Sequence, residues 1–498
     1  MRRDTARSIA WNYAGHLYQI AINLALTSYI VRHVSVPEYG LYLLILSLSI
    51  TLYLLDMGFS NLLVQAYVAV ADEPDKDSFN QLLSTSFLTL TALGTVGVLI
   101  FYAISKRLPG PFNIPSLYLH EASTIFVLAA VVILFGFCSM AVEQAFRASH
   151  RFDRLNQIQL IVSSLQAVAS VAVLAGGYRI VALASIQVGV AFLQFVLLVA
   201  VLPSSVPGAR LSLFRFRFHA IRPFLHLSKW AFLNNLSGYV FDLLAWVILG
   251  SMGTMQDAAM FGLASKAPKQ LWNLVDKGAS VALPMLSESS HDEDIRRLQR
   301  TYTQTQVLVF GAILPFIVLG ILFARPLIQL WAGEQYTNAS PVMQWLLLAA
   351  FSHALGYASD QLLYACGEVK KAATMAFWGG ALSVVFALLL VPRYGAAGLA
   401  AGMAVTQLFV NCVWFTRAAC DISRTSPLTL VKAILNGLIW PAVVLVAEIG
   451  LIWGISLFLS TAWVLASAVL GGAVYLAVWA FSTAMPIYRR PLPAEIAD

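Results

Sequence analysis

Long apolar runs, each near the length that crosses a bilayer, follow one another along almost the whole chain. A hydrocarbon core of about 30 Å requires about 20 apolar residues per helix. Because the alternation typical of transmembrane strands is absent, the predicted fold class is an all-α polytopic membrane protein. Two of the runs, 41–70 and 258–286, are long and interrupted by polar residues. The fourteen predicted helices lie near residues 11–32, 41–70, 80–105, 121–147, 154–176, 180–202, 223–251, 258–286, 300–323, 338–366, 370–391, 394–420, 432–459 and 461–484.

The composition agrees with this class. Of the 498 residues 59% are hydrophobic and 11% are charged, whereas soluble domains carry about 25% charged residues. A water-soluble protein of this length could not bury so much apolar surface. The basic start, MRRDTARS, precedes an apolar run without a small-residue cleavage site, so we interpret that run as a retained first helix and not as a signal peptide.

The distribution of basic residues predicts the orientation in the membrane. With the N-terminus inside, 22 of the 31 Lys and Arg residues fall on the cytoplasmic side, and three more lie within the eighth predicted helix. An even number of helices returns the C-terminus, with Arg489 and Arg490, to the same side. The net charge of +7 therefore reflects topology and gives no reason to expect nucleic acid as a partner. The six basic residues on the outside are Arg32, Lys106, Arg107, Arg179, Arg325 and Arg393.

The sequence contains few other motifs that indicate binding or catalysis. The linker 203–222 alternates basic and aromatic residues, so it either lies on anionic headgroups or is a simple positive-inside loop. The four cysteines have no paired spacing, which argues against a metal site or a disulfide framework. No Gly-rich phosphate loop precedes a helix. We therefore expect no cofactor and no metal.

Two pairs of segments repeat at an offset of about 220 residues. LLDMGFSNLL (54–63) is similar to LVDKGASVAL (274–283), and YRIVALAS (178–185) is similar to YGAAGLAA (394–401). Such an offset corresponds to six helices and predicts two parallel repeats facing each other across a central cavity, an arrangement used for alternating access. Chance similarity between apolar helices is the alternative. The predicted organisation is an N-lobe at 1–202, a linker at 203–222, a C-lobe at 223–420 and two further helices at 421–498.

The stretch SKAPKQLWNLVDKGASVALPMLS (265–287) carries several charges within a predicted membrane helix. At 100° per residue, its polar side chains share one face of about 100°. A charge at the bilayer centre costs roughly 2.5–3.5 kcal/mol, so lysines there are expected to face water or anions. Alternatively, Lys277 pairs with Asp276 or Asp242 and Lys266 snorkels to the headgroups. The face contains Lys266, Lys269, Asn273, Asp276, Lys277 and Ser280.

Three other predicted helices carry polar stripes that could line the same cavity or could serve as hydrogen-bonding glue between helices. Within the 258–286 run, Pro268 is expected to loosen the first helical turns of the charged stretch. The stripes consist of Asn12, His16, Gln19, Asn23 and Thr27 in the first helix, Asn235 and Asp242 in the seventh, and His353, Tyr357, Asp360 and Tyr364 in the tenth.

Several motifs, in order, resemble those of a known group. They are VRHVSVPEYGLYLLILSLSITLYLLDMGFSNLLVQ (31–65), FDLLAWVILGSMG (241–253), LIQLWAGEQYTNASPVMQWLLLA (327–349), YACGEVKKA (364–372) and VPRYGAAGLAAGMAVTQ (391–407). The chain is similar to polysaccharide-biosynthesis flippases of the multidrug/oligosaccharidyl-lipid/polysaccharide (MOP) exporter superfamily. The resemblance covers most of residues 8–420.

The resemblance implies a fourteen-helix, two-lobed transporter of the inner membrane. It implies movement of an undecaprenyl-diphosphate-linked oligosaccharide from the inner to the outer leaflet, with membrane lipids, a polymerase and assembly proteins as partners. Cavity cations would attract the diphosphate, a role carried onto Lys266 and Lys269, with Lys277 next. Asp56 and Asp276 occupy matching Asp-x-Gly positions, expected to fix helix ends. Asp242 and Asp360 are candidates for binding a coupling cation or locking a gate.

Three alternatives to this function remain open. A peptidoglycan-precursor flippase shares the fourteen-helix plan and a cationic cavity. A multidrug/cation antiporter would have a cavity dominated by carboxylates, whereas the charged stretch here is net positive. A polysaccharide polymerase would be an enzyme with a large outer loop bearing catalytic groups, but the longest predicted outer loop, 106–121, has one carboxylate, Glu121. We therefore expect a transporter and not an enzyme.

Overall fold

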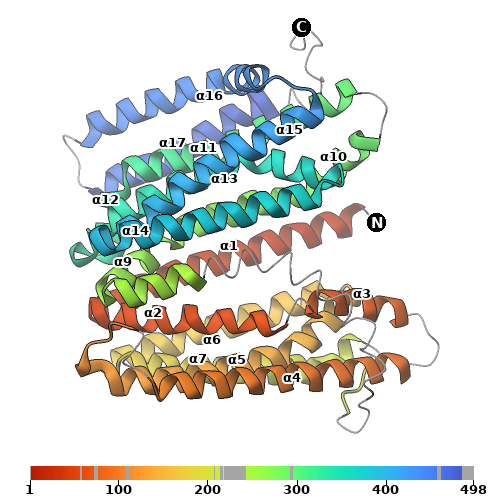
Figure 1. Ribbon diagram of the computed structural model, residues 1–498, viewed down its shortest axis with the longest axis vertical. Coiled ribbons are helices and arrows are strands. Elements are labelled where there is room, and N and C mark those ends of the chain that lie inside the picture. Colours follow the sequence, from red (N-terminus) through yellow and green to blue (C-terminus); the bar gives the residue numbers. More distant parts are fainter. Residues whose placement is uncertain are drawn as a thin grey trace. The chain divides into compact units, whose positions relative to one another are not determined.

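The computed structural model describes residues 2–56, 59–71, 77–107, 112–206, 208–212, 217, 243–291, 295–456 and 461–484. Throughout these ranges the regular structure is helical, and they contain no strand. The chain forms two compact units, Met1–Ala259 and Met260–Asp498, called unit 1 and unit 2 below. The helices of each unit run side by side (Figure 1). The predicted all-α class is confirmed.

Unit 1 is built around long helices that pack pairwise, above all α4 against α5 and α5 against α7. Its first helix packs along α6. The helix Leu243–Met252 follows the linker, and α9 (Met255–Ala264) crosses into unit 2. The earlier elements are α1 (Arg2–His33), α2 (Val36–Ile50), the 3-10 helix η1 (Thr51–Asp56), α3 (Phe59–Ala71), α4 (Asp77–Ser105), the 3-10 helix η2 (Ser116–Tyr118), α5 (Leu119–Ala148), α6 (Phe152–Ala175) and α7 (Ile180–Ser205).

Unit 2 is organised around α13, which packs against α10, α11 and α14. The last two helices, α16 and α17, pack on each other and on α11. The elements are α10 (Lys266–His291), α11 (Ile295–Leu322), α12 (Ala324–Ala332), η4 (Glu334–Tyr336), α13 (Ala339–Ala365), α14 (Val369–Phe409), the π-helical η5 (Val410–Phe415), α15 (Thr416–Ser423), α16 (Pro427–Ser456), α17 (Thr461–Trp479) and the π-helical η6 (Ala480–Ala484).

Eight helical segments in the described part of the chain are long and apolar enough to cross a bilayer. One of them, Val369–Ser423, is 55 residues long. It contains both predicted spans 370–391 and 394–420, and its backbone leaves the helical conformation at Gly395 (φ 53°). The protein is thus a multi-pass membrane protein, while the number fourteen stays a prediction.

The predicted run 41–70 is divided into α2, η1 and α3. Asp56 ends η1, and its buried carboxylate caps the start of α3. The backbone N–H and the hydroxyl of Ser60 donate to it, at 3.0 Å to Oδ1 and 2.6 Å to Oδ2. A capping carboxylate satisfies donors that the first helical turn cannot use internally. Asp56 therefore fixes a helix end, as the Asp-x-Gly sequence predicted.

The predicted run 258–286 is also divided, with α9 ending at Ala264 and α10 beginning at Lys266. Pro268 has no N–H to donate to the carbonyl of Ala264, so a continuous helix would lose a hydrogen bond here. The Ser265 hydroxyl donates to the Gly262 carbonyl at 3.0 Å, which leaves the Ala264 carbonyl without the missing bond. Pro268 lies in the first turn of α10, the place where it was expected to loosen the charged stretch, and proline is tolerated there.

Two similar capping motifs begin α2 and α9, which occupy corresponding positions in the predicted sequence repeats. The N–H of Ser35 donates to Glu38 at 3.0 Å at the start of α2, and the N–H of Thr254 donates to Asp257 at 2.9 Å at the start of α9. In each motif the carboxylate three residues on accepts from the capping residue. At α9 the Asp257 N–H also donates back to the Thr254 hydroxyl at 3.1 Å, which completes a capping box, whereas at α2 the Ser35 hydroxyl donates to Glu38 at 2.8 Å. The capping residues Ser35 and Thr254 are 219 positions apart in the sequence, and so are the accepting residues Glu38 and Asp257. This spacing is close to the offset of the sequence repeats.

The contact-based units divide between Ala259 and Met260. Helix Leu243–Met252 consequently belongs to unit 1, whereas the sequence prediction placed the whole of 223–420 in the second lobe. The predicted lobe boundaries, 1–202 and 223–420, stay a prediction.

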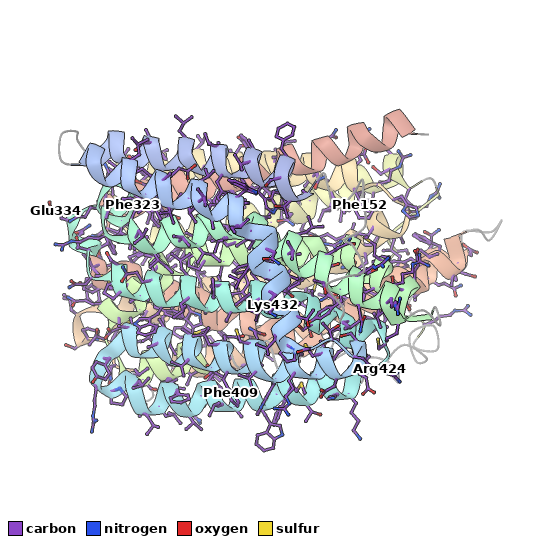
Figure 2. The ribbon with its side chains drawn as sticks, turned by 90° about the horizontal axis from the view of Figure 1, so that it is seen from above. Phe152, Phe323, Glu334, Phe409, Arg424 and Lys432 are labelled. Atoms are coloured by element: carbon purple, nitrogen blue, oxygen red, sulfur yellow. The ribbon has the colours of Figure 1, made fainter. Side chains whose placement is uncertain are left out.

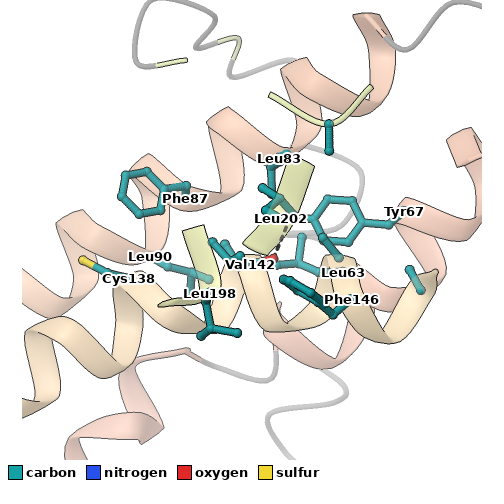
Figure 3. Close-up of a cluster of buried hydrophobic side chains, with 14 of the residues drawn as sticks. Leu63, Tyr67, Leu83, Phe87, Leu90, Cys138, Val142, Phe146, Leu198 and Leu202 are labelled. Carbon is teal, nitrogen blue, oxygen red and sulfur yellow. Dashed lines mark hydrogen bonds between the residues drawn. The ribbon is translucent and has the colours of Figure 1, made fainter. Parts of the chain in front are cut away.

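The core of unit 1 is a cluster of leucine, valine and aromatic side chains from α3, α4, α5 and α7 (Figure 3). Tyr67 is fully buried in it, and its hydroxyl hydrogen-bonds Ser86 at 2.6 Å and donates to the Ala141 carbonyl at 3.3 Å. In unit 2 the hydroxyls of Tyr302 and Ser359 hydrogen-bond at 2.8 Å in a similar core. These two buried phenols thus find partners between helices, and burial without a partner would be costly.

Glu334 and Arg424 mark the two ends of unit 2 along the helix direction. Figure 2 shows Glu334, in the connection before α13, and Arg424, after α15, at opposite ends of the unit. The predicted topology puts the connection that contains Glu334 on the outer side of the membrane and the connection that contains Arg424 on the cytoplasmic side. The two connections thus lie at opposite ends of the helices, while their assignment to the inside and the outside stays a prediction.

Candidate functional site

The strongest polar contact between α10 and α13 joins Asp276 to His353. Nε2 of His353 lies 2.9 Å from Oδ1 of Asp276, and the imidazole donates because an ionised carboxylate can only accept. The Asp276 side chain is 56% exposed and the His353 side chain 20% exposed. This contact brings together two residues from separate predicted polar stripes.

Two aromatic rings hold the imidazole in place. Trp272, one helical turn before Asp276, packs against it with ring centroids 4.5 Å apart at 31°. Tyr357, one turn after His353 on α13, meets it edge-on at 6.2 Å and 72°. Spacings of four residues put these side chains on common helix faces. The ring orientation of His353 is therefore fixed from both helices.

A second carboxyl lies near the first. Asp360, three residues after Tyr357, is within electrostatic range of Asp276. Its Oδ2 accepts a long hydrogen bond of 3.4 Å from the side chain of the adjacent Gln361. The Tyr357 hydroxyl is buried, lies within electrostatic range of both carboxyls, and has no hydrogen-bond partner among the described residues. We call Trp272, Asp276, His353, Tyr357 and Asp360 the Asp–His cluster.

The two predicted substrate-binding lysines lie at the start of the same helix. Lys266 is the first residue of α10 and is partly buried, while Lys269 is exposed. They are close enough for their charges to interact. Lys269 and Asp276 are seven residues apart, which is about 10 Å along one face of a helix. One face of α10 therefore presents cations at its N-terminal end and the Asp–His cluster two turns later.

The other predicted site residues do not belong to the Asp–His cluster. Asn273 is exposed on α10; on α1, Gln19 is partly buried and Asn23 is exposed. Asp276 does not cap a helix, because α10 continues through Gly278, so the expected role at a helix end is wrong for this residue. The remaining candidates lie outside the described side chains, namely Asn12, His16, Asn235, Asp242, Lys277 and Ser280.

Unit 1 contains a polar cavity that the sequence analysis did not anticipate. It has a volume of about 320 Å³ and lies between α5, α6 and α7, with room for roughly ten water molecules. The Gln194 amide donates to Glu143 at 3.0 Å, and Arg147, one helical turn after Glu143, lies 4.0 Å from the same carboxylate. The polar residues that line the cavity are Tyr53, Ser139, Glu143, Gln159, Ser163, Gln166, Gln187 and Gln194.

A signal for this cavity was present in the sequence. Gln159 and Gln166 are seven residues apart on α6, and Gln187 and Gln194 are seven apart on α7. That spacing places each pair on one helix face. Glutamines in apolar helices are also common as interhelical hydrogen-bonding residues, so the spacing by itself does not predict a cavity.

Comparison with known families agrees with the helical architecture and the motif order. The family model described as "Polysaccharide biosynthesis protein" matches residues 30–341, more than half of the chain. The chain belongs to the polysaccharide biosynthesis protein family. A second model, "Lipid II flippase MurJ", matches residues 275–474. The first match confirms the polysaccharide-biosynthesis family that the order of the motifs implied.

Relatives of this family member share low identity over long alignments. A "Putative O-antigen transporter" of Shigella flexneri is 20% identical, covering 84% of this chain and 98% of the relative. A solved structure of the lipid II flippase MurJ in an inward closed conformation has a TM-score of 0.72 at 14% identity, covering 97% and 99% of the two chains. An inward-facing multidrug MATE transporter of the MOP superfamily has a TM-score of 0.69 at 15% identity, covering 82% and 96%. The structural similarities establish the fold.

Proposed function

We propose that this protein moves an undecaprenyl-diphosphate-linked oligosaccharide from the inner to the outer leaflet of the cytoplasmic membrane for surface polysaccharide assembly. Membership of the polysaccharide biosynthesis protein family supports the substrate class. The similarity to an O-antigen transporter supports it as well. Both termini lie in the cytoplasm in this proposal, and a polysaccharide polymerase and assembly proteins receive the product.

One observation carries the proposal at the level of residues. α10 presents Lys266 and Lys269 at its N-terminal end, in a chain of which only 11% is charged. Ammonium groups bind phosphate strongly as point charges. A lipid-linked oligosaccharide carries its diphosphate at the junction of sugar and lipid, so a transporter needs cations that meet it within the membrane. Lys266 and Lys269 supply the charge, with Lys277 next along the helix.

Alternating access completes the proposed mechanism. The two sequence repeats would form lobes around a central cavity, with the lysine-bearing helix contributing to its lining. Reorientation of the lobes exposes the cavity to each leaflet in turn. The Asp–His cluster would change its hydrogen bonding between the two states. Two carboxyl groups are candidates for binding a coupling cation or locking a gate during this reorientation. They belong to Asp360 and to Asp242, which lies outside the described residues.

The test replaces Lys266 and Lys269 by alanine, singly and together, in cells that depend on this protein for their surface polysaccharide. Losing a charge-assisted hydrogen bond costs about 1.5–3 kcal/mol, so each single variant is expected to weaken binding of the lipid-linked oligosaccharide at least about tenfold. Export of polysaccharide should fall in parallel. Lys370 and Lys371, an exposed pair at the start of α14, are the matched control. Normal export at normal protein level would remove both lysines from the site.

A lipid II flippase is the second candidate, favoured by the match of that family's model to residues 275–474. Its substrate would meet the same lysines. Depletion of the protein distinguishes the two functions: lysis is expected for a peptidoglycan-precursor flippase, and loss of a dispensable glycan is expected for the first candidate.

A further inference from the structure

The polar cavity of unit 1 has no part in the transport mechanism proposed above. Its volume of about 320 Å³ falls at the lower end of the range for small-molecule sites, which begins at about 300 Å³. Room for roughly ten water molecules corresponds to the size of one sugar ring with its hydroxyl groups. The cavity is therefore large enough for a single sugar unit and too small for a whole oligosaccharide.

Two of the helices that form the cavity each turn a glutamine-bearing face toward it. On α6 the lining residues Gln159, Ser163 and Gln166 are spaced by four and three residues. On α7 the lining residues Gln187 and Gln194 are seven apart. These spacings bring side chains onto one face of a helix. The polar groups of the cavity are therefore arranged in two rows that face a common space.

Two of the glutamines are held in position by bonds within unit 1. The side-chain amide of Gln187 donates to the hydroxyl of Tyr42 at 3.1 Å, and that of Gln194 donates to Glu143 at 3.0 Å. Each bond uses an N–H group, so the amide carbonyl oxygen is left to accept from a ligand. Side chains that are already ordered lose little conformational freedom on binding. The two amides are therefore preorganised.

Other polar groups of the lining have no bond within the protein. The side chains of Ser139 on α5 and Gln166 on α6 make no hydrogen bond to any residue that the structure describes. Ser139 is only 3% exposed, and a buried hydroxyl without a partner is costly. The occupant of the cavity must therefore form hydrogen bonds, as water or a ligand rich in hydroxyl groups does.

The charge of the lining selects the class of ligand. Among the described residues that line the cavity there is no lysine, arginine or histidine, so a phosphate would find no cation. The carboxylate of Glu143 already accepts from Gln194, and a divalent cation needs several oxygen ligands. A glutamine amide presents a donor and an acceptor side by side, and each sugar hydroxyl both donates and accepts. The lining therefore fits an uncharged saccharide.

The cavity reaches the surface near the predicted cytoplasmic ends of its helices. Gln159 is exposed and lies two turns into α6, and Glu143 lies in the last two turns of α5. The predicted topology puts the connection between these two helices, residues 149–151, in the cytoplasm. A sugar unit that starts on the cytoplasmic side would thus meet Gln159 first.

We propose that this cavity is a saccharide subsite, in which the amides of Gln166, Gln187 and Gln194 hydrogen-bond the hydroxyl groups of one sugar unit. Ser139 and Glu143 complete the set from α5. The inference rests on the proposed function, because the sugar unit belongs to the lipid-linked oligosaccharide that the protein moves. It adds that neutral groups of unit 1 bind the glycan itself, so that transport depends on sugar hydroxyls as well as on the diphosphate.

The test uses the free oligosaccharide that mild acid releases from the lipid-linked oligosaccharides of the source cells, a probe without lipid or diphosphate. Its Kd for the full-length protein in nanodiscs is measured by titration with saturation-transfer NMR. Gln166→Leu should raise Kd about two- to tenfold, as expected for one hydrogen bond. It should unfold at the temperature of the parent, because no described bond is lost. Gln157→Leu, at an exposed position of α6 outside the lining, is the matched control and should leave Kd unchanged.

A second variant fills the cavity. Ala191→Phe puts an aromatic ring into the lining of α7 and should abolish saturation transfer, whereas Ala200→Phe, at an exposed position of the same helix, should retain it. Inorganic diphosphate should not displace the oligosaccharide, because the described lining contains no cation.

Three results would overturn the subsite, namely an unchanged Kd in either cavity variant, displacement of the oligosaccharide by diphosphate, and absence of binding by the parent. The last would mean that the cavity holds water only. The proposed function fails by a different result: deletion of the protein would leave export of surface polysaccharide intact. Loss of export on deletion, together with saccharide binding that ignores the cavity variants, would remove the subsite alone.

Discussion

The imidazole of His353 donates to the carboxylate of Asp276 across 2.9 Å, and this bond links α10 to α13 beside a second carboxyl group, that of Asp360. Trp272 packs on the imidazole from the Asp276 side. The two residues are 77 positions apart in sequence. Their contact therefore reports the packing of α10 against α13 more directly than any apolar pair does.

A double-mutant cycle on this pair should reveal a coupling free energy. We expect Asp276→Ala and His353→Ala together to cost about 1 kcal/mol less than the sum of the single variants, since the hydrogen bond is lost only once. The free energies are measured by unfolding of the purified protein in detergent. Asp257→Ala combined with His353→Ala is the control and should be additive. Additivity of the Asp276 and His353 variants would show that the bond contributes nothing.

The two capping motifs predict parallel losses of stability. Removing the hydroxyl or the accepting side chain at an N-cap costs about 1 kcal/mol. Ser35→Ala at the start of α2 and Thr254→Ala at the start of α9 should each lower the free energy of unfolding by about that amount. Ser185→Ala, in which an exposed serine of α7 donates only to the carbonyl of Val181, should change it little. A loss in one variant and none in the other would contradict an equivalent role of the two motifs.

Hydrophobic patterning predicted the helical class and the position of most helices, because a span in a bilayer needs a long apolar run whatever it packs against. The predicted 80–105 and 121–147, for example, correspond to α4 (Asp77–Ser105) and α5 (Leu119–Ala148). Hydrophobic patterning did not locate the helix breaks inside the runs 41–70 and 258–286. The division at Ser265 depends on the missing N–H of Pro268, and the division before Phe59 depends on a capping carboxylate, so both are local effects that hydropathy does not register.

The site was predictable in part. Spacing placed Lys266, Lys269 and Asp276 on one helix, and a separate stripe contained His353 and Asp360. Spacing did not predict that Asp276 would bond to His353, because that requires the register of α10 against α13. The glutamine-lined cavity of unit 1 was missed for a related reason: single polar residues gain meaning only when neighbouring helices bring several together.

The two Asp-x-Gly motifs should respond differently to mutation, although they occupy matching positions in the repeats. Asp56→Ala removes the acceptor of two Ser60 donors in a buried position and should lower the free energy of unfolding by about 1–3 kcal/mol. Asp276→Ala loses one bond at a residue whose side chain is 56% exposed and should cost about 1 kcal/mol or less. Thermal unfolding in detergent measures both. Equal losses would indicate that the motif has the same structural role in the two repeats.

Gly40, in the PEYG segment, should be the least replaceable glycine of unit 1. A methyl group added there would collide with the backbone carbonyl of Met255 and lie 3.0 Å from the backbone nitrogen of Ala259. A backbone cannot rotate away as a side chain does, so Gly40→Ala must move α2 away from α9. Overpacking of this kind costs about 1–3 kcal/mol.

Gly189, in the middle of α7, is the matched control for Gly40. Nothing lies within 4 Å of a methyl group added at Gly189. Alanine stabilises a helix interior relative to glycine by about 0.5–1 kcal/mol, so Gly189→Ala should unfold at the parent temperature or above it. Gly40→Ala should unfold below it and yield less folded protein from membranes. If Gly40→Ala were as stable as Gly189→Ala, α2 and the start of α9 would not be in direct backbone contact, and the packing of the PEYG segment described above would be wrong.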